Sequence, residues 1–274
     1  MARCLLGLRE EQGMARAFSS LIVFACSAVV LSGCATQRET HAPDVVKGSS
    51  ESDMAAGFLI KNMRVEDQVR AYVVYVPPAY TPDKAWPLVV FLHGIGERGD
   101  DGLFQTEVGI GRAIRRHPER FPCLVLMPQC PKTCLWHRAM NGVEIAMAQT
   151  REEYAIDPAR IYLTGLSMGG FATWQYGATR LDTFAALMPI CGGGHIEDAQ
   201  KLATVPIWAF HGADDSTVSP KKSREMVQAI KQAGGDIQYT EYPDTGHNSW
   251  DKAYDDPAAI AWLLKQRKAQ ASGE

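Results

Sequence analysis

Ser167 is flanked by glycines in the stretch GLSMG, residues 165–169. This pattern is typical of a nucleophile elbow, a sharp turn between a strand and a helix that exposes the serine hydroxyl. Three specified positions also occur together by chance, so the neighbouring sequence has to support the interpretation. The apolar run 160–163 predicts a buried strand preceded by a turn at Asp157-Pro158, and the proline-free run 168–178 predicts a helix. The sequence therefore favours Ser167 as a nucleophile.

A serine nucleophile needs an imidazole to accept its proton and a carboxylate to orient that imidazole. Of the seven histidines, His247 follows a glycine turn late in the chain and completes the order Ser, Asp, His. Two adjacent acids, Asp214 and Asp215, follow the apolar run 207–210. Neighbouring residues of an extended segment point in opposite directions, so only one of the two can orient His247. The pattern by itself leaves both acids open.

The segment FLHGIGERGDD, residues 91–101, offers backbone donors for the negative charge that develops on an ester carbonyl oxygen. We expect one N–H group from Met168, the residue after the serine, and one from Ile95 in the His-Gly-Ile-Gly turn. The alternative for this turn is a tight glycine turn with a structural His93. Trp136 follows PQCPKTC and is either part of the acyl or alcohol pocket or a core aromatic residue.

The elements that must position these residues alternate along the chain. Predicted strands cover residues 69–77, 87–94, 123–128, 160–163, 185–190, 205–210 and 237–243. Predicted helices cover Glu107–Arg116, Val143–Tyr154, Met168–Ala178, Ser219–Gly234 and Ser249–Gln266. This alternation predicts an α/β fold with a mainly parallel β-sheet and helices on both faces. Ligand sites of such sheets lie at the carboxyl ends of the strands, where the motifs above fall.

The chain resembles the α/β-hydrolase superfamily, in particular its serine esterase and "predicted peptidase" group with dienelactone-hydrolase-like and polyhydroxybutyrate-depolymerase-like enzymes. The resemblance spans about residues 68–267 and is carried by FLHGIGERGDD, LVLMPQCPKTCLW, IYLTGLSMGGFATW, PIWAFHGADDSTVS and GHNSWDKAYDD. It favours Asp215, four residues after His211, as the acid. It implies a carboxylesterase that forms an acyl-enzyme on Ser167 with His247 as base, without cofactor or metal.

Two other functions are compatible with this pattern. One is a serine peptidase on the same fold, and the other is a non-catalytic binding lipoprotein. A β-propeller segment and an insertion in the place of a lipase lid are both missing from the sequence, which weakens the peptidase and lipase interpretations. The ester substrate stays open among short-chain acyl esters, feruloyl or acetyl glycans and polyesters, as does the oligomeric state.

The composition excludes several classes of partner. The chain has 274 residues, with 28 Lys and Arg against 31 Asp and Glu, and a net charge of −3. This balance does not suggest a nucleic-acid surface. The Cys-x3-Cys spacing of 130 and 134 lacks a matching His/Cys pair, so zinc is not expected. Disulfide pairing stays open among Cys123, Cys130, Cys134 and Cys191.

The N-terminal region predicts export. A basic start at Arg16, an apolar run over 21–31 and Leu-Ser-Gly-Cys at 31–34 are typical of a lipoprotein signal peptide over 1–33, with Met14 as the better start. An uncleaved membrane anchor is the alternative. We expect a lipidated Cys34 as the only membrane contact, a tether over 34–57 and a catalytic domain over 58–270. The protein would then lie in the cell envelope or be secreted.

Overall fold

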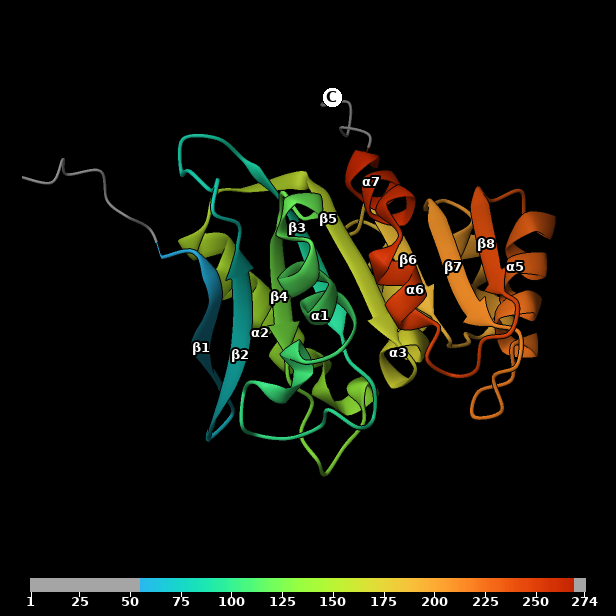
Figure 1. Cartoon of the computed structure of the whole chain (residues 1–274), viewed down its shortest axis with the longest axis horizontal. Helices are drawn as coiled ribbons and strands as arrows, with labels where there is room; N and C mark the ends of the chain where they lie inside the picture. Colours follow the sequence, from blue (N-terminus) through green and yellow to red (C-terminus); the bar gives the residue numbers. More distant parts are fainter. Residues whose placement is uncertain (1–54, 269–274) are drawn as a thin grey trace, which may run out of the picture. The chain divides into compact units, whose positions relative to one another are not determined.

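The computed structural model describes residues 55–268, which form one eight-stranded sheet with the order β1-β2-β4-β3-β5-β6-β7-β8 (Figure 1). The strands are β1 Gly57–Val65, β2 Gln68–Val76, β3 Trp86–Leu92, β4 Leu124–Pro128, β5 Ile156–Leu166, β6 Ala186–Ile190, β7 Ile207–Gly212 and β8 Ile237–Tyr242. β1 and β2 form an antiparallel hairpin, and β2 pairs antiparallel with β4. From β4 to β8 every pair is parallel, so the carboxyl ends of these strands meet at one edge.

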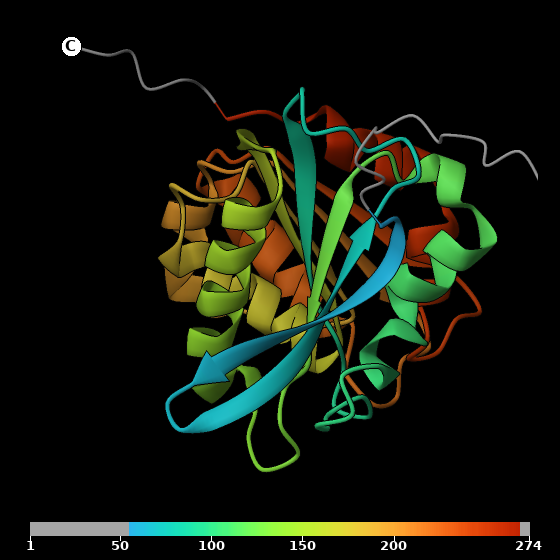
Figure 2. The same cartoon turned by 90° about the vertical axis from the view of Figure 1, so that its left-hand side faces the viewer.

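Helices cover both faces of this sheet, as Figure 2 shows. One face carries α1 Gly109–Arg116, α6 Trp250–Asp255 and α7 Pro257–Lys265, and the other carries α2 Trp136–Glu153, α3 Met168–Thr179, α4 Ala199–Leu202 and α5 Lys221–Gln232. Three short 3-10 turns complete the elements: η1 Phe104–Thr106, η2 Pro118–Arg120 and η3 Ile196–Asp198. Successive strand residues alternate between the two cores, as in β3, where Val90 faces one core and Phe91 the other. The predicted α/β architecture is confirmed.

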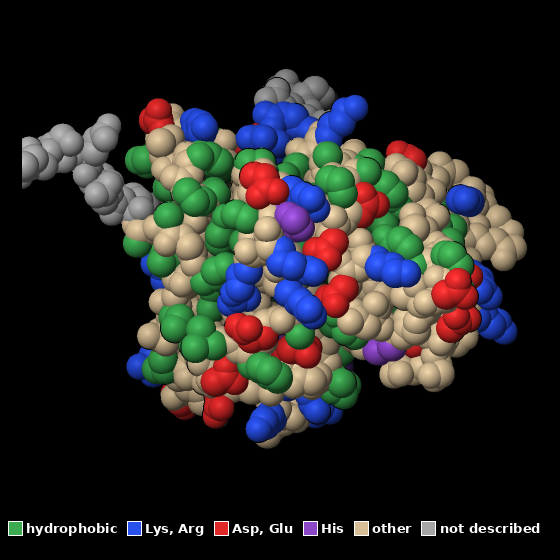
Figure 3. All heavy atoms as spheres, in the orientation of Figure 1, with side chains coloured by type: hydrophobic (Ala, Val, Ile, Leu, Met, Phe, Trp, Pro, Cys, Tyr) green, Lys and Arg blue, Asp and Glu red, His purple; other side chains and the backbone are tan. Residues whose placement is uncertain are grey.

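The face formed by α1, α6 and α7 carries basic and acidic side chains next to one another (Figure 3). Some of them pair across helices: Arg116 lies 2.7 Å from Asp255, and Arg112 lies 3.3 Å from Asp251. These pairs are partly exposed, so each contributes about 1 kcal/mol or less to stability. Both α1 and α6 contribute buried apolar side chains to the same core, and this packing contributes more to their attachment than the exposed ion pairs do.

The predicted helix over 249–266 is in fact two helices, α6 and α7. The prediction was wrong because Pro257 has no backbone N–H and its ring excludes a preceding helical turn. Pro257 instead occupies the first turn of α7, where an N–H is not needed. The Asp256 carboxylate caps this helix by accepting the Ala258 N–H at 2.8 Å.

Other element boundaries also differ from the prediction. β5 begins at Ile156, so Asp157-Pro158 lies within the strand and not in a turn before it. The Asp157 carboxylate accepts the Ala159 N–H at 3.0 Å and bonds Arg160 at 2.8 Å, which compensates locally for the proline. α2 starts at Trp136, seven residues before the predicted start at Val143.

The N-terminal predictions lie almost entirely outside the described residues. This holds for the signal peptide over 1–33, for Cys34 and for residues 34–54 of the tether, whereas β1 begins at Gly57, the last residue assigned to the tether. In the part of the chain that the structure describes, no helix has the length and apolar character to span a bilayer. The four cysteines in this part are free thiols, including the neighbouring Cys130 and Cys134.

Candidate active site

Ser167 occupies a strained turn between β5 and α3. Its φ of 52° and ψ of −116° lie in a region that residues with a side chain rarely adopt. The flanking glycines are required because the backbones nearly touch. A Cβ on Gly165 would lie 2.5 Å from the Gly169 carbonyl oxygen, and a Cβ on Gly169 would overlap the carbonyl oxygen of Leu92. The structure thus places Ser167 in the elbow geometry that the sequence predicts.

His247 bridges Ser167 and Asp215. Its Nε2 lies 2.9 Å from Ser167 Oγ, and its Nδ1 lies 2.7 Å from Asp215 Oδ2. Asp215 follows β7 and His247 follows β8, so the parallel sheet brings both to the edge at which β5 ends. The three residues singled out from the sequence are therefore in one hydrogen-bonded chain, with the imidazole in the middle.

Asp215 is held as a carboxylate. Burial opposes its ionisation, but hydrogen bonds from His247 and from the backbone N–H groups of Val218 and Thr217 outweigh burial and lower its pKa. The adjacent Asp214 is exposed, and its backbone N–H donates to the Thr245 carbonyl oxygen at 2.9 Å. Of the two acids that the sequence left open, Asp215 is the one in contact with His247.

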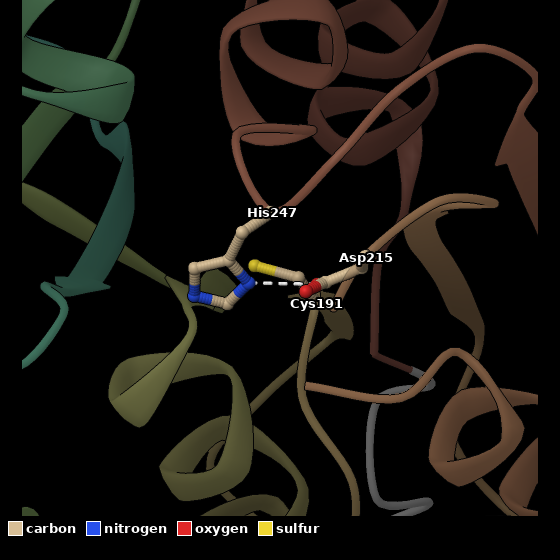
Figure 4. A group of neighbouring side chains, drawn as sticks. All are labelled: Cys191, Asp215 and His247. Carbon is tan, nitrogen blue, oxygen red and sulfur yellow. Dashed lines mark hydrogen bonds and ion pairs between the residues drawn. The ribbon is translucent and has the colours of Figure 1, made fainter. Parts of the chain in front are cut away.

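Cys191 lies behind this group and was not found by sequence reasoning (Figure 4). It follows β6 with a φ of 41°, and its Sγ accepts the Ser167 N–H at 3.3 Å. Cys191, Asp215 and His247 offer ligand atoms within 4.8 Å of one another. Burial raises the pKa of the Cys191 thiol to about 12, so its sulfur keeps its proton near neutral pH. A metal ion binds the thiolate form, and these three residues therefore do not favour a metal site. No motif marks Cys191, because its place depends on β6 pairing with β5.

Ile95 and Met168, the two expected oxyanion donors, border Ser167. Met168 is the first residue of α3, where a backbone N–H has no acceptor within the helix. Ile95 is in the loop after β3, and its side chain is exposed. Both line a cleft of about 430 Å³ that also contains Ser167. A cleft of this volume is on the scale of small-molecule sites, which hold roughly 300–1,000 Å³.

His93 fixes the peptide that carries the Ile95 N–H. The Cys130 N–H donates to His93 Nε2 at 2.9 Å, so Nε2 is unprotonated and Nδ1 carries the hydrogen. Nδ1 then donates to the Gly94 carbonyl oxygen at 2.7 Å. In a trans peptide the C=O and N–H point in opposite directions, so the Ile95 N–H points away from the imidazole. Gly94 itself borders the nucleophile, because an added Cβ would lie 3.7 Å from Ser167 Cβ.

The neutral form of His93 suits this role. Its side chain is fully buried, and burial lowers its pKa to about 4. The ring packs against Trp136 with centroids 4.9 Å apart, and Trp136 Nε1 donates to the His93 carbonyl oxygen at 2.9 Å. Trp136 is thus a buried aromatic residue that also borders the cleft containing Ser167.

Arg98 braces the other side of the same loop. Its Nε donates to the Ile95 carbonyl oxygen at 3.1 Å, and its Nη1 donates to the carbonyl oxygens of Lys132 and Cys134 at 3.1 and 3.3 Å. The loop over 93–98 is therefore fixed by residues 130–136.

A further hollow of about 480 Å³ is bordered by β2 and residues 129–133. It is not lined by Ser167, Asp215 or His247.

Comparisons with known proteins agree with this geometry. The model of the dienelactone hydrolase family matches residues 124–266, which include Ser167, Asp215 and His247. The bifunctional acetylxylan esterase/xylanase XynS20E of Neocallimastix patriciarum is 38% identical over 135 residues, 46% of this chain and 19% of that protein. Poly(3-hydroxyalkanoate) depolymerase C of Paucimonas lemoignei is 29% identical over 130 residues, 35% of this chain and 30% of that protein. The match thus spans less than a third of either relative.

Solved structures show the same fold. The crystal structure of a thermostable esterase has a TM-score of 0.71 and 35% identity, covering 77% of this chain and 63% of that one. A feruloyl esterase module from Clostridium thermocellum, complexed with sinapinate, has a TM-score of 0.62 and 17% identity, covering 80% of this chain and 92% of that one. The second similarity concerns the fold alone. The α/β-hydrolase fold predicted from the sequence is confirmed.

Proposed function

Because this chain belongs to the dienelactone hydrolase family, we propose that it is a serine carboxylic ester hydrolase that forms an acyl-enzyme on Ser167. The observation that carries the proposal is the position of His247, whose two ring nitrogens lie 2.9 Å from Ser167 Oγ and 2.7 Å from Asp215 Oδ2. In this arrangement one imidazole can remove the serine proton while a buried carboxylate stabilises the imidazolium that results.

In the acylation step, Ser167 Oγ forms a bond to the ester carbonyl carbon as His247 Nε2 takes the hydroxyl proton. The carbonyl π electrons move onto oxygen, and the N–H groups of Ile95 and Met168 donate to that oxyanion. When the C=O bond re-forms, the bond to the alcohol oxygen breaks, and His247 delivers its proton to the leaving alkoxide. The products are an alcohol and an ester of Ser167.

Deacylation repeats these steps with water as the nucleophile. His247 takes a proton from water, hydroxide oxygen bonds to the acyl carbon, and the same two N–H groups hold the oxyanion. Collapse breaks the bond to Ser167 Oγ, which recovers its proton from His247. Asp215 keeps the hydrogen on Nδ1 throughout, so Nε2 stays free to accept a proton in each half-reaction.

The substrates of the relatives suggest where to look for the ester. Their names refer to acetylxylan and to poly(3-hydroxyalkanoate), which are both ester-bearing polymers. We propose a polymer-linked or small-molecule ester as the substrate class. A peptidase on the same fold is separated from this proposal by matched ester and amide substrates, because a peptidase hydrolyses both, whereas an esterase should hydrolyse the ester and leave the amide intact.

We further propose that the mature chain begins at a lipidated Cys34 and is held at a membrane of the cell envelope by that lipid. The support is the sequence itself: Leu-Ser-Gly-Cys closes an apolar run of signal-peptide length.

A fluorophosphonate probe tests the proposed function. The purified protein should be labelled on Ser167 and should hydrolyse p-nitrophenyl acetate, and Ser167→Ala should abolish both. Ser216→Ala is a matched control, because Ser216 is an exposed serine next to Asp215 and should be dispensable. Labelling of a different serine, or labelling that persists in Ser167→Ala, would contradict the proposal. Absence of labelling would favour a non-catalytic binding protein.

A further inference from the structure

A second hollow of about 330 Å³ adjoins the active-site cleft. It shares His137, Ala172 and Gln175 with the cleft that contains Ser167. Because the same three residues border both spaces, the two form one groove that begins at the nucleophile. We call this the α3 groove, and its far end is lined by Met140, Tyr176, Thr179 and Arg180.

The α3 groove runs the whole length of α3. Met168 borders the end at the nucleophile, and Thr179 borders the far end. Residues 168, 172, 175 and 179 follow helical spacing and share one face of the helix. With a rise of 1.5 Å per residue, the eleven steps from Met168 to Thr179 correspond to about 16 Å. This length exceeds what an ester of a short acid and a short alcohol can occupy.

The chemistry of the groove changes along its length. Near the serine the walls are apolar, with Leu135, Met168 and Phe171 partly exposed to the cleft. Further along, the Thr179 hydroxyl donates to the Tyr176 carbonyl oxygen, and Gln175 Nε2 lies 3.4 Å from His195 Nε2, so the atoms left for a ligand are the acceptors Thr179 Oγ1 and Gln175 Oε1. This part of the groove therefore suits a ligand that donates hydrogen bonds.

The far end is close to neutral. Among the described residues that border it, Arg180 is the one permanently charged side chain, and its Nε donates to the Glu144 carboxylate at 2.7 Å. The Arg180 guanidinium also donates to the Thr179 carbonyl oxygen at 3.1 Å. Because the Glu144 carboxylate offsets the charge of the Arg180 guanidinium, the far end presents little net positive charge to an anionic chain.

We infer that the far end of the α3 groove is a subsite for a neutral, hydroxyl-bearing chain, and that the protein acts on esters carried by an oligosaccharide. The inference rests on the proposed function, since the groove begins at Ser167. Hydroxyl groups can donate to the acceptor oxygens of Gln175 and Thr179. A polyester chain supplies acceptors only and would leave the acceptor atoms of both side chains unused.

Thr179→Trp tests the subsite by filling it. Thr179 is exposed, and its Oγ1 donates only to the Tyr176 carbonyl oxygen at 3.0 Å. Thr204→Trp is a matched control, because Thr204 is also exposed, makes the same kind of bond to the Lys201 carbonyl oxygen at 2.8 Å, and lies outside the groove. We expect Thr179→Trp to raise KM for an acetylated xylo-oligosaccharide about tenfold relative to KM for p-nitrophenyl acetate, the equivalent of about 1.4 kcal/mol. Thr204→Trp should leave this ratio unchanged.

Gln175→Leu tests the chemistry of the subsite at nearly constant volume. It should raise KM for the acetylated xylo-oligosaccharide but not for an oligomer of 3-hydroxybutyrate, because only the sugar needs the amide. If Thr179→Trp leaves the ratio of KM values unchanged, or Thr204→Trp changes it equally, the subsite is wrong. If the hydroxybutyrate oligomer is hydrolysed and the oligosaccharide is not, the groove binds a polyester and the inference is overturned. If p-nitrophenyl acetate is not hydrolysed and Ser167 is not labelled, the proposed function itself fails.

Discussion

His93 allows the geometry of the proposed oxyanion hole to be tested without changing Ser167, Asp215 or His247. Its Nδ1 donates to the Gly94 carbonyl oxygen, and its Nε2 accepts the Cys130 N–H. Two amide side chains each reproduce one half of this pattern. Asn places an N–H donor near the position of Nδ1, and Gln places an acceptor near the position of Nε2. His93→Asn and His93→Gln therefore separate the two hydrogen bonds.

The expected magnitudes follow from what each variant loses. His93→Gln frees the peptide between Gly94 and Ile95 to rotate, and loss of one oxyanion donor costs about 10²–10³ in kcat. His93→Asn keeps that peptide oriented, so kcat should fall less than about tenfold. It leaves the buried Cys130 N–H without an acceptor, which should cost about 1–3 kcal/mol in the free energy of unfolding. Both variants lose the imidazole packing against Trp136, so this loss cancels in the comparison.

The assay is the hydrolysis of p-nitrophenyl acetate, with kcat and KM measured separately, together with denaturant unfolding of each variant. The effect of His93→Gln should fall on kcat, because the oxyanion exists only in the transition state and the intermediates. If both variants have the same kcat, or if His93→Asn is the slower one, then His93 does not act through the Gly94 carbonyl and the reasoning is refuted.

Four further outcomes are expected. Ser167→Ala should lower kcat by about four to six powers of ten, and mass spectrometry should find the fluorophosphonate on Ser167 in the parent protein. Asp215→Asn should lower kcat by roughly four powers of ten with the fold intact, whereas Asp214→Asn should keep most activity; the reverse result would move the acid by one residue. Cys34→Ser should release the protein from the membrane fraction, and unchanged anchoring and processing would exclude the lipoprotein signal. Folding lowers the pKa of His93 from 6.5 to about 4, so protonation of this residue opposes folding. The free energy of unfolding should therefore decrease as the pH falls from 6.5 to about 4, by about 3 kcal/mol in total. Urea titrations should show this decrease in the parent protein and not in His93→Gln.

The sequence was sufficient for the fold class and for the residues at the strand ends. Ser167 is marked by its glycines, since the local backbone contact requires small residues on both sides. His247 is marked by its order in the chain and its glycine turn. Asp215 could be separated from Asp214 only through the family resemblance, because the direction of each side chain depends on the loop after β7.

Other features depend on contacts between distant segments and leave no local pattern. Cys191 reaches Ser167 only because β6 pairs with β5 in register, which places Ile190 beside Leu166. No strand was predicted over residues 58–65, because strand formation in β1 depends on pairing with β2. The division of the last helix into α6 and α7, in contrast, has a local signal. Pro257 is visible in the sequence, and its ability to end a helix was underestimated.

The loop after β3, which carries the proposed oxyanion donor Ile95, shows why a motif is only part of a site. The His-Gly-Ile-Gly turn contains the Ile95 N–H, but its direction is set by partners in the loop between β4 and α2: the Cys130 N–H bonds His93, and the carbonyl oxygens of Lys132 and Cys134 accept from Arg98. Cys130, Lys132 and Cys134 make these bonds with backbone atoms. Their side chains can therefore be exchanged, whereas the backbone conformation of residues 130–134 has to be kept. Insertion or deletion within residues 130–136 should therefore reduce kcat more than any single side-chain change there, with the exception of Trp136, whose indole N–H is itself a partner of the His93 carbonyl oxygen.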